Sequence, residues 1–229
     1  MTNLDKAYTA TARFGAVSDT LDAEGGIIDL NAPLPSEKAI RDALPTFTGD
    51  LLQVPPMTSA LKRGGVRLYD LHRRGIIVQR EARPVTVHSL GLAGLDPTEQ
   101  TATFEISCSS GTYVRTLISD LAESLGSGAY LTALRRTSVG HLTVKDAPPP
   151  QNLSPETLHN HIIQPLEVVA HLPEVEVPEE VGCGLVCHGR RIGRCRVDGS
   201  YKVMCRGEML AVYRDDEDAG RPEVVLCAL

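Results

Sequence analysis

One segment of the chain, residues 111–126, has a pattern that leaves little choice in how it folds. Its apolar residues recur at i, i+3, i+4, i+7 and i+11 (Val114, Leu117, Ile118, Leu121 and Leu125), and Gly126 follows where a helix would end. The segment is therefore predicted to be an amphipathic helix with one stripe buried in a core. Arg115 lies in its first turn, beside the positive end of the helix dipole, where a cation is unfavourable. From the pattern alone, a solvated surface arginine is as good an interpretation as a functional one.

The rest of the first 150 residues alternates between strand and helix patterns. Residues 7–15 place apolar side chains at every second position, which predicts a half-buried strand. Residues 18–26 form an acidic loop that ends in two glycines, and Ser36 is predicted to cap a helix that Pro45 limits in length. Residues 76–90 and 101–109 read as two further strands.

A length of 229 residues allows one large domain, or a medium domain followed by a small one. The boundary is predicted at the prolines that follow Ala147, and Ser154-Pro155 is expected to begin a short helix. We therefore expect domains at 1–150 and 172–229, joined by a connecting helix and linker at 151–171. Because the chain has no run of eighteen apolar residues and no cleavable leader pattern, we expect a soluble, cytoplasmic protein.

Six cysteines raise the question of a metal site: Cys108, Cys183, Cys187, Cys195, Cys205 and Cys227. Cys183 and Cys187 with His188 resemble half of a zinc site, but the second close pair of ligands is missing. Residues 192–205 read as a hairpin around Asp198-Gly199, in which Cys195 and Cys205 share the apolar face. We therefore interpret the cysteines as core thiols and expect no metal.

Positive charge is concentrated in two regions of a chain whose net charge is -6. Residues 60–85 carry seven basic side chains against two acidic ones: Lys62, Arg63, Arg67, Arg73, Arg74, Arg80 and Arg83 against Asp70 and Glu81. Residues 189–206 carry six against one: Arg190, Arg191, Arg194, Arg196, Lys202 and Arg206 against Asp198. The pattern indicates either that these two regions bind a polyanion or that they are two solvent-exposed charged faces.

Several segments, in order along the chain, resemble the TruB-type tRNA pseudouridine synthases. QVPPMTSALKRGGVRLY matches the family's Q-x-P-P-x-x-S-A-x-K-x-x-G-x-x-L-Y segment, and DKAYTATARFGAVSDTLDAEG matches its Lys-x-Tyr strand and following loop. REARPVTV, CSSGTYVRTLISDLAESLG and GAYLTALRRTSVG match later segments, and the last third resembles a PUA-like RNA-binding domain more weakly.

The resemblance implies an α+β fold, with a mixed, mainly antiparallel central sheet, flanking helices and a small β-rich PUA-like domain. It implies isomerisation of uridine to pseudouridine at position fifty-five, in the T loop of tRNA, after the base is flipped from its stack. It implies no cofactor, tRNA as the partner and a monomeric protein.

The resemblance also assigns roles to residues. Tyr8 matches the tyrosine that stacks on the target base, and Arg115 matches the arginine that pairs with the catalytic aspartate. Asp22 and Tyr113 match supporting polar positions, although a turn-forming Asp and a core Tyr are alternative interpretations. The segment that contains Lys62, Arg63, Arg67, Arg73 and Arg74 is expected to lie against the T-arm backbone, behind a rigid Pro-Pro elbow.

The sequence departs from the family pattern at its most important position. The family's nucleophilic Asp lies in a G-x-L-D-P-x-A-[TS]-G motif upstream of the Lys-x-Tyr strand, and no such motif occurs in these 229 residues. Three alternatives explain the missing motif. The sequence is a fragment or has a misplaced start, it is a truncated protein that binds tRNA without catalysis, or a second polypeptide supplies the motif. We expect this chain to be inactive by itself, with Arg115 lacking its partner. A metal-dependent hydrolase that uses Asp19, Asp22 and Glu24 is a further alternative.

Overall fold

The computed structural model describes residues 1–145 and 147–227, apart from the side chain of Cys183. The chain divides into two compact units, Met1–Ala147 and Pro148–Leu229. Among the helices described, none combines the length and the apolar character needed to span a lipid bilayer.

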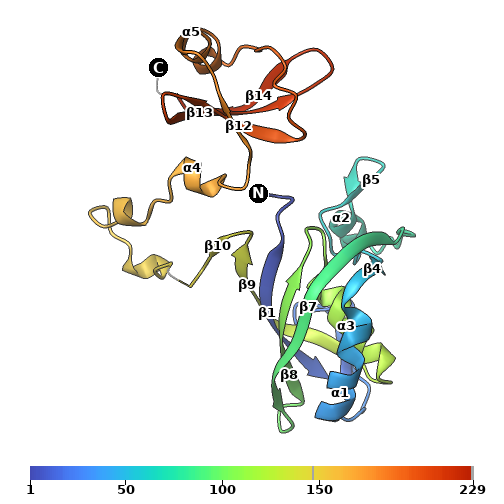
Figure 1. Cartoon of the computed structure of the whole chain (residues 1–229). Coiled ribbons are helices and arrows are strands. Elements are labelled where there is room, and N and C mark those ends of the chain that lie inside the picture. The colour runs from blue at the N-terminus through green and yellow to red at the C-terminus, as the bar shows by residue number, and fades with distance from the viewer. Residues whose placement is uncertain (146, 228–229) are drawn as a thin grey trace. The chain divides into compact units, whose positions relative to one another are not determined.

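A six-stranded sheet forms the centre of the first unit, in the order β10-β9-β1-β8-β7-β4 (Figure 1). Its strands are β1 (Lys6–Phe14), β4 (Gly49–Gln53), β7 (Arg83–Asp96), β8 (Thr101–Cys108), β9 (Ala129–Val139) and β10 (Leu142–Thr143). All pairings in this sheet are antiparallel. The alternation predicted for residues 7–15 is confirmed, because Ala10, Ala12 and Phe14 are buried on one face of β1.

The strand predicted at residues 76–90 begins later than the apolar run suggests. Strand β7 starts at Arg83, which pairs with Gln53 at the end of β4, and residues 76–82 form no strand. Beyond Gln53 the chain continues into Pro55 and Pro56, which have no N–H group to donate to a neighbouring strand. The ladder ends there, so the prediction was wrong for residues 76–82.

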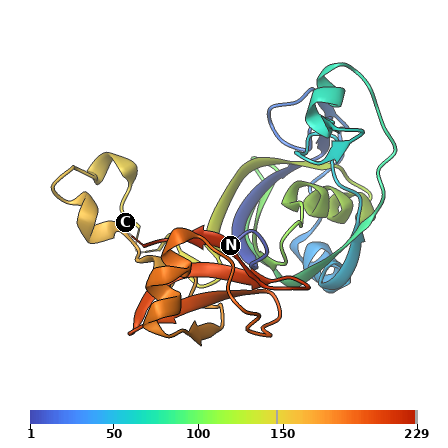
Figure 2. The same ribbon diagram turned by 90° about the horizontal axis from the view of Figure 1, so that it is seen from above.

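Two predicted helices pack on the sheet, as Figure 2 shows from above. Helix α1 (Glu37–Ala43) begins where Ser36 Oγ accepts a hydrogen bond from the Ala39 N–H, and a 3-10 turn (Leu44–Phe47) follows it. Helix α3 (Val114–Ser124) buries Leu117, Ile118 and Leu121 almost completely. Both helix predictions are confirmed.

Two small hairpins and a short helix complete the first unit. Strands β2 (Ala16–Ser18) and β3 (Ile27–Asp29) flank the acidic loop. Strands β5 (Lys62–Arg63) and β6 (Val66–Arg67) form a hairpin that leads directly into helix α2 (Leu68–Arg73). Gly64 and Gly65 make the turn of that hairpin with positive φ angles of 57° and 83°, which glycine adopts without a steric penalty.

The second unit is built on a four-stranded sheet in the order β11-β12-β13-β14. Its strands are β11 (Glu174–Glu176), β12 (Ser200–Cys205), β13 (Glu208–Asp215) and β14 (Gly220–Val225). Its helices are α4 (Pro165–Val168) and α5 (Glu179–Gly184), with 3-10 turns at Pro150–Asn152, Leu158–His161 and Val186–His188. The helix expected at Ser154-Pro155 is only a turn, in which Ser154 Oγ accepts from the Thr157 N–H, and the 3-10 turn follows it.

The hairpin predicted at residues 192–205 does not form. Strand β12 pairs with β11 on one side and with β13 on the other, so neither edge is free for residues 192–199. That segment is irregular, and the Asp215 carboxylate binds its backbone by accepting the Arg196 N–H at 2.6 Å. The hairpin that does form turns at Arg206-Gly207, because the antiparallel partner of β12 is β13, which follows β12 in the sequence.

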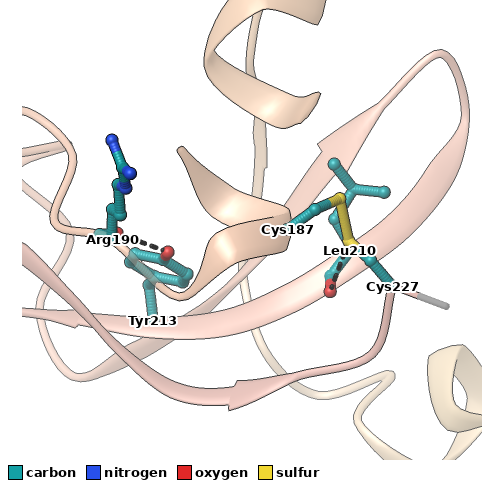
Figure 3. The surroundings of a disulfide bond; sticks show 5 residues. All are labelled: Cys187, Arg190, Leu210, Tyr213 and Cys227. Carbon is teal, nitrogen blue, oxygen red and sulfur yellow. Dashed lines mark hydrogen bonds between the residues drawn. A yellow bond between two sulfur atoms is a disulfide. The ribbon is translucent and has the colours of Figure 1, made fainter. Parts of the chain in front are cut away.

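The cysteines divide into core thiols and a disulfide. Cys108 and Cys205 are buried in the two cores, and Cys195 packs against the second core, as expected. Cys187 and Cys227 instead form a disulfide, which is shown in Figure 3, so their interpretation as core thiols was wrong. The pairing joins residues that are 40 positions apart, and only the tertiary fold brings them together. The side chain of Cys183 lies outside the described part of the chain.

Candidate active site

Arg115 and Asp22 form an ion pair at the beginning of helix α3. Arg115 Nη1 donates to Asp22 Oδ2 at 2.5 Å, and both side chains are about three-quarters buried, at 22% and 25% exposure. Asp22 comes from the acidic loop between β2 and β3, 93 residues away in the sequence. The expectation that Arg115 lacks a partner in this chain was therefore wrong: a carboxylate of the chain itself is bound to it.

The same guanidinium connects two loops. Arg115 Nη1 also donates to the Thr20 carbonyl at 3.1 Å, and Nη2 donates to the Thr58 carbonyl at 3.0 Å. Thr20 belongs to the acidic loop, and Thr58 lies after the Pro-Pro elbow. These contacts resolve the unfavourable place of a cation at a helix start, because Arg115 is matched by one charge and two carbonyl dipoles.

Several hydrogen bonds hold Asp22 in its ionised form. Burial raises the pKa of this carboxyl, but hydrogen bonds from Thr20 Oγ1, from the Glu24 N–H and from Arg115 outweigh it, so the pKa lies below its ordinary value. Asp22 is thus a turn-forming residue and the partner of Arg115 at the same time. The turn-forming interpretation is confirmed, and the supporting role of Asp22 toward a substrate stays a prediction.

Helix α3 is held at its N-cap residue by the end of strand β4. The Tyr113 N–H donates to Gln53 Oε1 at 2.7 Å, and Gln53 Nε2 donates to the Tyr113 carbonyl at 3.1 Å. Tyr113 occupies the N-cap position, where no side chain of the helix makes a capping bond. The backbone of Tyr113 therefore joins the start of α3 to Gln53.

A cleft of about 410 Å³ opens beside the ion pair. The acidic loop supplies Thr20, Asp22 and Glu24, and helix α2 with its flanks supplies Tyr69, His72 and Arg73. Thr58 and Arg115 complete its lining. The fold thus places the helix of the first basic region against the acidic loop, with the ion pair between them.

The first basic region is an exposed surface around one aromatic ring. Arg67 and Arg73 lie over the Tyr69 ring, with their guanidinium carbons 5.8 Å and 5.6 Å from its centre. Lys62, Arg63, Arg67, Arg73 and Arg74 are all exposed. Within the described residues, none of these five forms an ion pair with a carboxylate. Their charge is available to a ligand.

Two of the six basic side chains of the second basic region pair with carboxylates of the same unit. Lys202 is buried and pairs with Glu174 at 2.8 Å, and Arg206 pairs with Glu179. Arg194 donates to the Glu217 carbonyl at 3.2 Å. The net charge of +5 counted from residues 189–206 overstates this patch, because its acidic partners come from elsewhere in the sequence.

Tyr8 lies on β1, opposite Arg136 of β9 and Ile106 of β8. Burial raises the pKa of its hydroxyl above the ordinary value, and the Cys108 thiol acts in the same direction, while a hydrogen bond with Arg136 opposes them. The ring is half-buried against the core. The Tyr8 hydroxyl therefore lies beside Arg136 of the neighbouring strand.

The carboxylates of the acidic loop hold the loop itself together. Asp19 Oδ1 accepts from the Gly26 N–H at 2.8 Å, and Asp22 is bonded to Arg115 as described. Among residues 1–145 and 147–227, no group of three or more His, Cys, Asp or Glu side chains is arranged to hold a metal ion. The hydrolase alternative has no support in this geometry.

Sequence reasoning missed Gln53, Thr20 and Thr58 as parts of the site. Thr20 and Thr58 contribute backbone carbonyls, and every residue type has one, so the side chain at these positions does not indicate the contact. Gln53 could have been suspected, because it is a polar residue at the end of a strand, directly before the Pro-Pro elbow.

Comparison with known proteins identifies the fold first. A chain of a Cbf5–Nop10–Gar1 complex superposes on 98% of this chain with a TM-score of 0.66, at 19% sequence identity. A chain of an H/ACA ribonucleoprotein bound to a substrate RNA gives a TM-score of 0.64 over 99% of this chain, at 16% identity. The fold is α+β, and it is the fold of these solved chains.

Sequence comparison then identifies the family. The family model described as "TruB family pseudouridylate synthase (N terminal domain)" matches residues 1–114. The chain is 41% identical over 216 residues to a tRNA pseudouridine synthase B of Aromatoleum aromaticum, covering 93% of this chain and 69% of that protein. It is 42% identical over 212 residues to one from Burkholderia lata, covering 91% of this chain and 64% of that protein. The chain belongs to the TruB family of pseudouridylate synthases.

Proposed function

We propose that this chain is the substrate-recognising part of an enzyme that isomerises uridine to pseudouridine at position fifty-five, in the T loop of tRNA. In this reaction the bond between the ribose and the uracil nitrogen is broken, and the uracil is rejoined through a carbon atom. The enzyme would act in the cytoplasm as a monomer. The reaction class is that of the family; the choice of uridine is the part that we propose.

One observation carries the proposal: the largely buried Arg115–Asp22 pair lines a cleft that is also lined by Tyr69, His72 and Arg73 of the first basic region. A base flipped from a loop needs a polar pocket beside a surface that binds the backbone of the same RNA. The five exposed basic residues from Lys62 to Arg74 offer that surface. Tyr8 would stack on the base, and Tyr113 would support the pocket.

The nucleophile is proposed to come from residues other than these 229. The family motif that contains the nucleophilic Asp does not occur among them, and Asp22 is already bonded to Arg115, Thr20 and Glu24. A tRNA-binding protein without catalysis is the alternative, and the same two observations favour it. Reading the in-frame codons upstream of Met1 for a G-x-L-D-P motif would distinguish a missing segment from a true truncation.

The small unit is proposed to be a PUA-like RNA-binding domain. Its support is the weak sequence resemblance and a β-rich sheet of four strands. Because Lys202 and Arg206 are neutralised, Arg190, Arg191 and Arg196 remain as its candidate phosphate contacts.

The test uses a T-arm stem-loop RNA with the 229-residue chain. Binding is measured by fluorescence anisotropy, and pseudouridine is measured by mass spectrometry after digestion. We expect binding without isomerisation, and isomerisation after an upstream segment containing the aspartate motif is restored. Failure to prefer the T-arm RNA over a stem-loop with a scrambled loop would contradict the proposed substrate. Pseudouridine formed by the chain alone would contradict the assignment of the nucleophile.

A further inference from the structure

Gln53 is a buried polar residue whose side-chain amide is bonded to one other residue through both of its polar atoms. It is the last residue of β4 and is 4% exposed. Its oxygen accepts the Tyr113 N–H, and its nitrogen donates to the Tyr113 carbonyl, across 60 residues of sequence. A buried amide with a matched donor and acceptor fixes the separation and the orientation of the two chains that it joins.

The segment that begins at Gln53 contacts helix α3 a second time. Five residues later the Thr58 carbonyl accepts a hydrogen bond from Arg115 Nη2 at 3.0 Å. Between the two contacts, Pro55 and Pro56 are buried and have fixed φ angles. Residues 53–58 are therefore attached to the first turn of α3 at both ends, with a stiff connection between the attachments.

The two attachments constrain different parts of the structure: one involves the Arg115 side chain, and the other involves the backbone at the start of α3. The bond from Thr58 depends on where the Arg115 guanidinium already lies, because Arg115 has a long and flexible side chain. The Gln53 amide binds the backbone of Tyr113, two residues before Arg115, and so determines where the helix begins relative to β4. Moving that backbone would move the Cα of Arg115 away from Asp22 and from the two carbonyls.

We propose that Gln53 is a positioning residue for the Arg115–Asp22 pair, acting through the Tyr113 backbone at the start of helix α3. The geometric claim concerns this chain alone, whereas its importance for an RNA substrate rests on the proposed function. The basic hairpin at Lys62–Arg63 lies further along the same segment.

Two substitutions separate the roles of the two amide atoms. Gln53→Leu keeps a similar volume and removes both hydrogen bonds. Gln53→Glu keeps an acceptor for the Tyr113 N–H, but when ionised it turns a second acceptor toward the Tyr113 carbonyl. When the introduced carboxyl is protonated, it again offers one donor and one acceptor, as the amide does. Burial raises the pKa of such a carboxyl, so its protonation occurs above the pH range in which Asp22 titrates.

The experiment measures the pKa of Asp22 by carboxyl NMR titration in the full 229-residue chain. In Gln53→Leu we expect the pKa of Asp22 to rise by about 1, since a guanidinium at contact distance lowers the pKa of a carboxyl by about 1–3. The matched control is Val87→Ala, a cavity in the same core at a residue that is fully buried. It should lower the stability of the unit while leaving the pKa of Asp22 unchanged. Glu24, His72 and Arg73 line the same cleft and are retained in every variant.

A second readout follows the Arg115 side-chain NMR signal as a function of pH. In Gln53→Glu the signal should return to its wild-type position as the introduced carboxyl is protonated, and in Gln53→Leu it should not. An Asp22 pKa that stays at the wild-type value in Gln53→Leu, or that shifts as much in Val87→Ala, would overturn the positioning role. If Gln53→Leu fails to fold, absence of the pH-dependent return in Gln53→Glu would overturn it. Neither readout involves RNA, so loss of the proposed substrate would leave the result intact.

Discussion

At the scale of single residues, Arg115 occupies a position that is unfavourable within its own helix and is stabilised by residues from other elements. A cation in the first turn of a helix is opposed by the helix dipole. The Asp22 carboxylate and the Thr20 and Thr58 carbonyls more than offset this, because hydrogen bonds with charged groups are stronger than those between neutral groups. One side chain thereby holds the acidic loop and the proline elbow to the same helix.

Arg115→Met should destabilise the first unit. The change leaves the Asp22 carboxylate and two carbonyls without their donor, which costs about 1–3 kcal/mol of unfolding free energy. Chemical denaturation of the wild type and the variant measures the difference. Arg41→Met is the control, because Arg41 makes an exposed pair with Glu37 on α1 and should cost about 0.5 kcal/mol or less. A neutral or stabilising Arg115→Met would mean that the pair with Asp22 contributes nothing.

Asp22 should make stability depend on pH in the acidic range. Its folded-state pKa lies below the ordinary value of 3.8, so its stabilisation is present above that value and is lost as pH falls through the folded-state pKa. Asp22→Asn should therefore be less stable than the wild type at neutral pH, and the difference should shrink below about pH 4. Denaturation curves at several pH values test this; a difference that is constant with pH would rule out the ionised carboxylate as its cause.

Tyr8 should contribute to RNA binding through its ring. Stacking of a base on an aromatic side chain is worth about 1–3 kcal/mol. Tyr8→Leu should therefore weaken binding of T-arm RNA by about fivefold or more, while Tyr8→Phe, which keeps the ring but loses the hydroxyl beside Arg136, should bind almost normally. Anisotropy titrations of both variants measure this. Equal affinities of Tyr8→Leu and the wild type would refute the stacking role.

At the scale of elements, the basic hairpin and helix α2 form one continuous surface that ends in the cleft. Strand β5 presents Lys62 and Arg63 beside the glycine turn, and helix α2 brings Arg73 to the cleft wall. The Pro-Pro elbow fixes where this surface begins, because both prolines are buried, Gln53 before them bonds to the N-cap of α3, and Thr58 after them bonds to Arg115.

Removing charge from this hairpin should change the salt dependence of RNA binding. Each phosphate contact contributes about 0.7–0.9 to the slope of log K against log salt concentration. The double change Lys62→Ala with Arg63→Ala should therefore reduce the slope by about 1.4–1.8. Lys38→Ala with Arg41→Ala removes the same charge from α1, where both residues pair with acidic neighbours, and serves as the control. If both double variants reduce the slope equally, the hairpin is not the contact surface.

At the scale of the whole molecule, two units with separate cores share one chain. Each core has its own set of buried residues, and the boundary lies at a run of prolines. The disulfide between Cys187 and Cys227 joins a 3-10 turn to the end of the second unit and lies wholly within that unit. The two units are therefore expected to respond differently to reduction.

Replacing Cys187 and Cys227 with serine should destabilise only the second unit. A disulfide that closes a loop of 40 residues contributes about 4 kcal/mol on a chain-entropy estimate. Calorimetry should show the transition of the second unit at a lower temperature and that of the first unit unchanged. Unchanged unfolding of both units would mean that the disulfide does not form in solution.

The sequence by itself determined the elements whose pattern is local. Strand β1, the capped helix α1 and helix α3 follow from period and capping, because each depends on residues within a few positions of one another. The ordered motifs also identified the family, the fold class and the basic segment. The same local reasoning failed where a partner strand decided the outcome, as at residues 76–82 and 192–199.

Only the tertiary structure decided which distant residues meet. It paired Arg115 with Asp22 across 93 positions, Gln53 with Tyr113 across 60 and Cys187 with Cys227 across 40. It also neutralised Lys202 and Arg206 with acidic residues that lie before β12 in the sequence. Hydrogen bonds and ion pairs act over a few ångströms of space, whatever the separation along the chain, so no local pattern contains them.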